Sequence, residues 1–173
     1  MVQGRKNPAH VDFPKRLKKA RQHRELSSAA LSLQAGLSLN AAYGLESGER
    51  IPRIDTIERL ARALQISPCA LAFGVEAAHG PATGLLCDGL PARLAEARAE
   101  RGLSRNGLGQ LSNTSDTLVR MTETGATVPT LEKLDALARA LRVSPCWLAF
   151  GLGPMEAPSR RRTRAAAVPP GAL

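Results

Sequence analysis

Apolar residues recur at helical spacing along most of the chain, in segments that are short. The clearest segment is 53–64 (RIDTIERLARAL), which places one set of apolar residues on a single helical face: Ile54, Ile57, Leu60, Ala61 and Leu64. The alternation of apolar and polar residues that is typical of strands is absent from the sequence. The pattern therefore predicts an all-α protein.

Capping residues and glycines divide the first half of the chain into about five short helices. The first covers 13–24, and Ser27 is a suitable N-cap for a second that runs to about Ala35. Gly36 interrupts the pattern, after which Ser38 can cap a third helix over 39–47 that ends at Gly48. The helix over 53–64 is the fourth, and a serine followed by proline at 67–68 predicts a short fifth helix.

The second half of the chain repeats the first without a gap. Residues 67–74 read SPCALAFG and residues 144–151 read SPCWLAFG, while LARAL occurs at 60–64 and again at 137–141. Roughly 25 of 62 aligned positions are identical between 13–74 and 90–151. In the second copy Asn113 replaces Gly36, and asparagine is the other residue that tolerates a left-handed turn.

The repeat predicts two tandem five-helix domains. They are 13–74 and 90–151, with an N-terminal arm (1–12), a linker (75–89) and a basic, disordered tail (152–173) around them. The four arginines of 159–173 leave two interpretations open. The tail tracks phosphates as a basic arm, or it is a solvated tail without a partner.

Composition and charge narrow the class of protein further. Only 3% of residues are aromatic, so the core must be built from aliphatic side chains. A net charge of +9 indicates a polyanionic partner, which can be DNA, RNA or an acidic protein. No stretch has the apolar length of a signal peptide or of a membrane span, so we expect no membrane association.

The three cysteines, Cys69, Cys87 and Cys146, form no CxxC pair, and their odd number argues against a disulfide framework. We therefore expect Cys69 and Cys146 to be small buried hydrophobes in a reducing cytoplasm. The histidines have no metal-ligand spacing, and the sequence has no phosphate-binding loop or nucleophile elbow. We expect a protein that is not an enzyme and needs no cofactor or metal.

The segments 26–52 (LSSAALSLQAGLSLNAAYGLESGERIP) and 103–129 (LSRNGLGQLSNTSDTLVRMTETGATVP) resemble the lambda-repressor/Cro-like (XRE-type) helix-turn-helix family. A helix, a three-residue turn and a second helix, with one helix before and two after, is the domain pattern of that family. The resemblance implies a bacterial, nucleoid-associated regulator that binds double-stranded DNA. It also implies that the third helix of each domain enters the major groove and touches base edges.

The family pattern, carried over position by position, gives candidate base-reading residues in the third helix of each copy. In the first copy they are Leu39, Asn40, Tyr43 and Gly44, and in the second copy they are Asp116, Thr117, Arg120 and Met121. Ser38 and Ser115 lie at the starts of these two helices. An asparagine can form paired hydrogen bonds with adenine, and an arginine can do so with guanine. The alternative is that these positions are ordinary solvated surface.

The resemblance also implies phosphate ligands and structural ion pairs. The family usually has glutamine at the first turn of the second helix, where this chain has Ser28 and Arg105, and both can donate to a phosphate. Arg50, after the reading helix, is a third candidate. The family pattern further implies two partly buried ion pairs between the first and third helices: Arg21 with Glu46, and Arg98 with Glu123.

The two copies are not equivalent. Copy one has a net charge of +5 and copy two only +2, and Thr122 replaces the inward-facing Leu45. Copy two is therefore a weaker reader or a packing domain, and we expect copy one to dominate DNA affinity. Two unlike readers can bind a non-palindromic site as a monomer, although a homodimer stays open. The rival interpretation is a protein-interaction module, such as an antitoxin or a cofactor of the transcription machinery.

Overall fold

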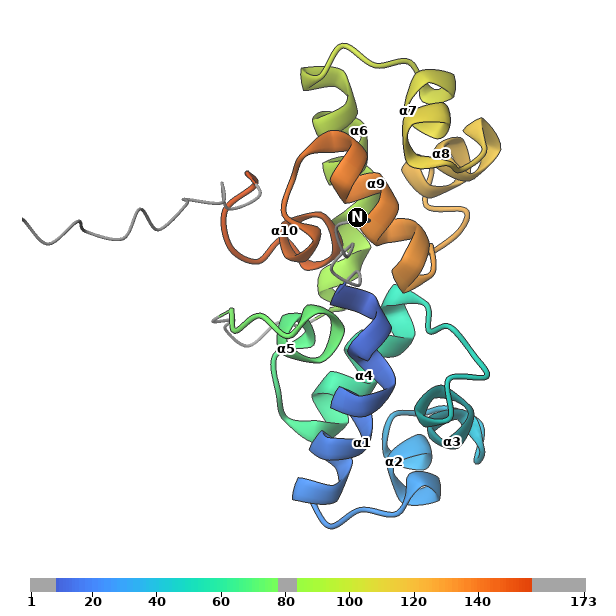
Figure 1. The fold of residues 1–173 in the computed structure, drawn as a ribbon, viewed down its shortest axis with the longest axis vertical. Coiled ribbons are helices and arrows are strands. Elements are labelled where there is room, and N and C mark those ends of the chain that lie inside the picture. Colours follow the sequence, from blue (N-terminus) through green and yellow to red (C-terminus); the bar gives the residue numbers. More distant parts are fainter. Residues whose placement is uncertain (1–8, 78–83, 157–173) are drawn as a thin grey trace, which may run out of the picture.

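The computed structural model describes residues 9–77 and 84–156, and within these ranges the chain is all-helical (Figure 1). Domain 1 consists of a short 3-10 helix and five α-helices: η1 (Ala9–Asp12), α1 (Phe13–His23), α2 (Ser28–Gln34), α3 (Ala41–Glu46), α4 (Ile54–Leu64) and α5 (Pro68–Phe73). Domain 2 repeats that order: η2 (Leu86–Gly89), α6 (Leu90–Glu100), α7 (Arg105–Ser112), α8 (Asp116–Glu123), α9 (Leu131–Leu141) and α10 (Pro145–Phe150). Most of the N-terminal arm, the middle of the linker and the arginine-rich tail lie outside the described residues.

The helices begin and end largely where the capping signals predict. Ser27 accepts a hydrogen bond from the Ala30 backbone N–H at 3.1 Å, and Ser104 does the same for Gly107 at 3.0 Å. Helix α7 is followed at once by Asn113, which has φ +52°, so asparagine does adopt the left-handed conformation expected of it.

The apolar face predicted for 53–64 is the centre of the domain 1 core. All five of its predicted residues have no exposed surface, and their counterparts on α9 are equally buried. Phe13 and Leu17 of α1 and Leu31 of α2 close the same core, which is mainly aliphatic, as the composition requires. The buried residues of the two domains form one continuous cluster.

The reading helix of domain 1 is shorter than predicted. Helix α3 begins at Ala41, whereas the pattern predicted a start at residue 39. The Ser38 side chain does not cap it; the Ser38 carbonyl accepts from the Ala41 N–H at 2.8 Å in a preceding turn. In domain 2 the prediction is confirmed, because the Ser115 hydroxyl accepts from the Leu118 N–H at 3.1 Å.

The two domains meet through equivalent residues. The Ile54 N–H donates to the Pro129 carbonyl at 3.1 Å, and the Leu131 N–H donates to the Pro52 carbonyl at 2.9 Å. Ile54 corresponds to Leu131 in the repeat, and Pro52 corresponds to Pro129, so the two bonds are reciprocal. Reciprocal contact between identical surfaces is the mark of a two-fold arrangement. One chain thus has the architecture of a symmetric dimer (Figure 1).

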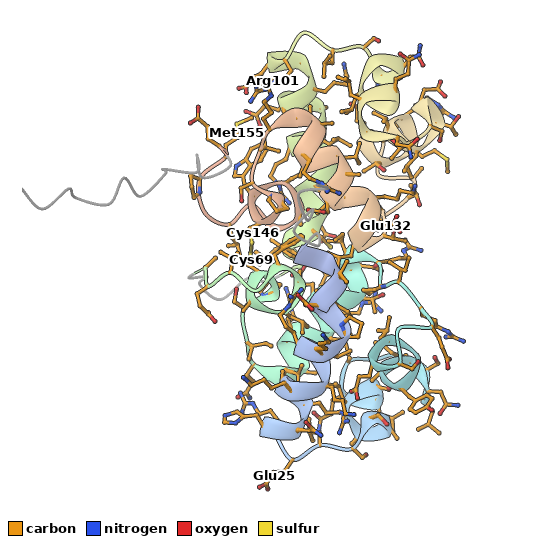
Figure 2. All side chains as sticks on the ribbon, viewed as in Figure 1. Glu25, Cys69, Arg101, Glu132, Cys146 and Met155 are labelled. Atoms are coloured by element: carbon orange, nitrogen blue, oxygen red, sulfur yellow. A yellow bond between two sulfur atoms is a disulfide. The ribbon has the colours of Figure 1, made fainter. Side chains whose placement is uncertain are left out.

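Cys69 of α5 and Cys146 of α10 lie on the same axis and form a disulfide (Figure 2). The sequence prediction that they are separate buried thiols is wrong on this point, although both are buried. Counting cysteines could not find the pair, because the residues are 77 positions apart and meet only through the two-fold arrangement. We expected a reducing compartment because the cysteines were predicted to be separate thiols. The disulfide removes that reason.

A buried carboxylate joins the end of the linker to domain 1. Glu58 of α4 is fully buried and accepts hydrogen bonds from the N–H groups of Leu86 at 2.6 Å and Cys87 at 3.0 Å, both in η2. Burial, together with the negative charge of Glu58, raises the pKa of the Cys87 thiol to about 12, so the thiol stays protonated. Residues 86–89 are therefore a structured part of the interface, whereas the sequence assigned them to a linker.

We expect the disulfide to contribute substantially to stability. Replacing both Cys69 and Cys146 with alanine should lower the melting temperature, because a bridge across 77 positions restricts the unfolded chain and is worth about 4 kcal/mol. The measurement is calorimetric unfolding of wild type and variant, each with and without dithiothreitol. The reductant should destabilise the wild type alone, and equal melting temperatures for all four samples would contradict the prediction.

Candidate nucleic-acid interface

The two predicted reading helices, α3 and α8, lie on the same side of the molecule near opposite ends of its long axis (Figure 1). Each packs on the helix before it, α3 on α2 and α8 on α7, as a helix-turn-helix pair. Because the domains are related by the two-fold arrangement, the two pairs face the same way. A ligand on this side of the molecule can contact both.

Short polar or small residues set the angle within each pair. In domain 1 the buried Ser32 hydroxyl donates to the Ser28 carbonyl at 2.8 Å and accepts from the Ala42 N–H at 2.9 Å, which ties α2 to α3. In domain 2 the equivalent residue is Gly109, where an added Cβ would lie 3.1 Å from the Asp116 nitrogen. The start of α8 therefore approaches α7 so closely that a side chain at Gly109 would require the neighbouring backbone to shift.

In domain 1, α3 turns Ala42 and Leu45 into the core, and three predicted readers on α3 and in the turn before it are exposed. Leu39 is 54% exposed and Tyr43 is 62% exposed, and Asn40 is exposed between them in the chain. Exposed apolar side chains of this size are available to a partner. Ser38 is also exposed beside them.

Gly44 does not belong to that exposed set. It is buried, and an added Cβ would lie 3.3 Å from the Arg50 side chain, which covers it. The Gly44 carbonyl accepts from the Arg50 N–H at 3.0 Å, so the two residues hold the loop after α3 in place. The prediction that Gly44 touches a base edge is therefore not supported by its position, whereas Arg50 is exposed as expected.

In domain 2, α8 exposes Asp116, Thr117 and Arg120, and half-buries Met121. The inward side of this helix carries Thr122, whose buried hydroxyl has no hydrogen-bond partner among the described residues. The threonine that replaces Leu45 thus leaves a polar atom in the domain 2 core without a partner among the described residues.

Both ion pairs implied by the resemblance are present. Arg21 binds Glu46 through two nitrogens, at 2.6 and 2.8 Å, and Arg98 binds Glu123 at 2.5 and 3.2 Å. Arg21 also donates to the Leu26 carbonyl at 2.7 Å. Each arginine thereby joins the first helix of its domain, the following turn and the reading helix.

The phosphate candidates differ between the domains. Arg105 donates to Glu123 at 2.7 Å, so this carboxylate is shared by two arginines. Burial alone would raise the pKa of Glu123, but the hydrogen bonds from Arg98 and Arg105 outweigh it and hold the pKa below its usual value. In domain 1 the corresponding Ser28 is half-buried. The contact between Arg105 and Glu123 was not visible in the sequence pattern.

Part of the positive charge of domain 1 serves the fold. Arg16 donates to the carbonyls of Leu71 at 2.9 Å and Ala72 at 2.5 Å, and Arg24 donates to the Leu64 carbonyl at 2.9 Å. Arg93 makes the equivalent bonds to the end of α10 in domain 2. The net charge of copy one includes Arg16, and the identity of Arg16 with Arg93 in the repeat is the sequence signal of its structural role.

The segment that forms the helix-turn-helix pair of domain 1 has almost no charge of its own. Within 26–48 the one charged residue is Glu46, which pairs with Arg21. Arg50 and Arg53, both exposed, supply the positive charge next to α3. The equivalent segment of domain 2 carries Arg105, Arg120 and two acids.

Comparison with known families agrees with this geometry. A model of the helix-turn-helix family matches residues 17–71, and a second model, of the helix-turn-helix domain, matches residues 90–149. The chain therefore belongs to the lambda-repressor-like (XRE-type) helix-turn-helix family of DNA-binding proteins, with one family domain in each half. No curated protein matches the sequence. Along the described residues, no helix is both long and apolar enough to cross a membrane.

The shared carboxylate predicts a pH dependence for domain 2. Glu123→Gln should destabilise the protein by about 3 kcal/mol at neutral pH, because it leaves partly buried arginine charge uncompensated. Since the folded-state pKa of Glu123 lies below the ordinary value of 4.5, the stabilisation is complete above that pH and is lost as the pH falls below it. The difference between wild type and variant should therefore shrink in acid.

Urea unfolding at several pH values from 7 to 3 measures this difference. Glu132→Gln, an exposed glutamate on α9 (Figure 2), is the matched control and should have little effect at any pH. A difference between wild type and Glu123→Gln that does not change with pH would refute the assignment.

Proposed function

We propose that this protein is a sequence-specific, DNA-binding transcriptional regulator, without enzymatic activity, that acts at the nucleoid in the bacterial cytoplasm. The observation that carries the proposal is the two-fold arrangement within one chain, which turns α3 and α8 to the same side. Members of this family usually need two subunits to present two reading helices to successive major grooves about 34 Å apart. Here one chain supplies both.

The proposed contacts to bases follow from the exposed side chains. In domain 1, Asn40 can pair with the two hydrogen-bonding groups of adenine, and Leu39 and Tyr43 can contact thymine methyl groups. In domain 2, Arg120 can bind guanine, with Asp116 accepting from cytosine and Met121 contacting a thymine methyl. Thr117 is the remaining exposed reader of that helix.

The proposed contacts to phosphates surround these readers. Ser28, Ser38, Arg50, Arg105 and Ser115 are the donors, together with backbone N–H groups at the starts of the helices. Arg105 can bind a phosphate through nitrogens other than the Nε that Glu123 holds.

Because the two reading faces differ, we propose that the operator is not palindromic. The uncharged face of domain 1 favours a half-site rich in A·T pairs, and Arg120 favours a guanine in the other half-site. We propose that domain 1 contributes more of the affinity, since Arg50 and Arg53 flank its reading helix while Arg105 is partly neutralised by Glu123.

A second candidate function is binding of a protein partner, such as a toxin or the transcription machinery. The observation that favours it is the exposed apolar set on and beside α2 and α3: Leu33, Leu39, Tyr43 and Ile51. Side chains of this kind are common at the centres of protein interfaces.

DNA binding is tested with the promoter next to the gene that encodes this chain. The protein should protect an asymmetric site from cleavage, and its affinity should fall steeply with salt because phosphate contacts release counterions. The variants Asn40→Ala, Tyr43→Ala and Arg120→Ala should each cost about 1–3 kcal/mol at one part of the site. The losses in domain 1 should exceed the loss from Arg120→Ala.

Arg142→Gln removes an exposed charge directly after α9, at a position where domain 1 has Gln65, and is the control for non-specific electrostatics. A larger loss from Arg120→Ala than from the domain 1 variants would reverse the ranking of the domains. Tight capture of a protein partner by the wild type, without salt-dependent protection of DNA, would favour the second candidate function and contradict the first.

A further inference from the structure

A large groove lies between α1 and α5 of domain 1, apart from the reading helices. Its volume is about 1000 Å³, within the range of sites that hold small molecules. The floor is apolar and is made by Ala20, Ile66, Ala70, Leu71 and Ala77. The rim is polar and includes Arg16, Lys19 and His23.

The comparison of the two domains shows why this groove is open. The residue of domain 2 that corresponds to Ala70 is Trp147, which is partly buried and packs against the core. The large indole therefore occupies on α10 a position that a single methyl group occupies on α5. Domain 2 also has Met155 packed there, and its carbonyl accepts from the Ser144 N–H at 2.7 Å (Figure 2).

A serine on the floor of the groove also differs in its bonding. The Ser67 hydroxyl is buried and has no hydrogen-bond partner within the described part of the chain. Its counterpart Ser144 accepts from the Trp147 N–H at 3.4 Å. Since an unpaired buried hydroxyl is unfavourable, a ligand atom that reaches Ser67 would be stabilised by it.

The charge on the rim is opposite in the two domains. In domain 1 the three positions on α1 hold Arg16, Lys19 and His23, and Glu76 is the acid among the lining residues. In domain 2 the corresponding positions on α6 hold Arg93, Glu96 and Glu100. The open groove thus has a basic rim, whereas the position filled by Trp147 has an acidic one.

We propose that the α1–α5 groove of domain 1 is a binding site for a small amphipathic anion, with an aromatic or compact aliphatic body and a carboxylate. The body would lie on the apolar floor where Ala70 leaves room, and the carboxylate would face Lys19 and His23 on the rim. This site is independent of the proposed DNA interface, so each assignment can fail without the other.

The test is titration of the ¹⁵N-labelled full chain with 1-naphthoate and, separately, with the uncharged isostere 1-naphthamide, followed by two-dimensional NMR. Naphthoate should cause saturable shifts in the amides of the groove, and naphthamide should bind about tenfold more weakly because it lacks the charge. Ala70→Trp should reduce naphthoate affinity at least tenfold while the melting temperature is retained, because domain 2 folds with tryptophan at this position. Ala70→Leu is a smaller substitution that serves if the tryptophan variant does not fold.

Charge controls complete the experiment. Lys19→Gln should weaken naphthoate but not naphthamide, whereas Arg101→Gln, which removes one charge at the far end of α6 (Figure 2), should weaken neither. The proposal is overturned if naphthoate causes no saturable shifts, if the shifts lie elsewhere, or if the Ala70 variants bind as well as wild type. Equal affinity for the two compounds would overturn the anion preference.

Discussion

The contact between equivalent residues at the domain boundary is the constraint on which the rest of the structure depends. Two peptide segments, each at the start of the fourth helix of its domain, exchange reciprocal backbone hydrogen bonds, and Cys69 meets Cys146 on the same axis. Reciprocal bonding requires the domains to be related by a rotation close to two-fold. That rotation turns both helix-turn-helix pairs to one side. It also joins two small apolar cores into one continuous core.

The two domains share this two-fold arrangement but differ in sequence at their surfaces. Structural arginines and acids are kept in both: Arg16 and Arg93 hold the ends of the last helices, and Glu58 corresponds to the buried Asp135. The surfaces differ, since domain 1 presents an uncharged reading face and an open basic groove, while domain 2 presents Arg120 and fills the equivalent groove with Trp147. The two copies therefore share the arginines that hold their last helices and differ in their reading faces and in the groove.

The sequence predicted those features that depend on local periodicity. The five helices of each domain, the buried face of α4, the left-handed Asn113 and the caps Ser27, Ser104 and Ser115 all follow from spacing and turn chemistry. It did not predict the features created when the copies meet, because a helical pattern identifies a buried face without identifying the surface that covers it. The pairing of Cys69 with Cys146 and the ordering of η2 by Glu58 are of this kind. The burial of Gly44 under Arg50 was missed for another reason, because a loop conformation within one domain leaves no periodic signal in the sequence.

Joining both half-molecules in one chain changes how occupancy depends on the amount of protein. A regulator that must dimerise first is assembled in proportion to the square of subunit concentration at low abundance, which makes its response steep. Here the second reading helix is always present at the fixed separation set by the domain contact, so its local concentration does not vary with expression. If one chain binds the proposed operator as a monomer, its occupancy at low abundance rises in linear proportion to copy number, which gives a graded dosage response.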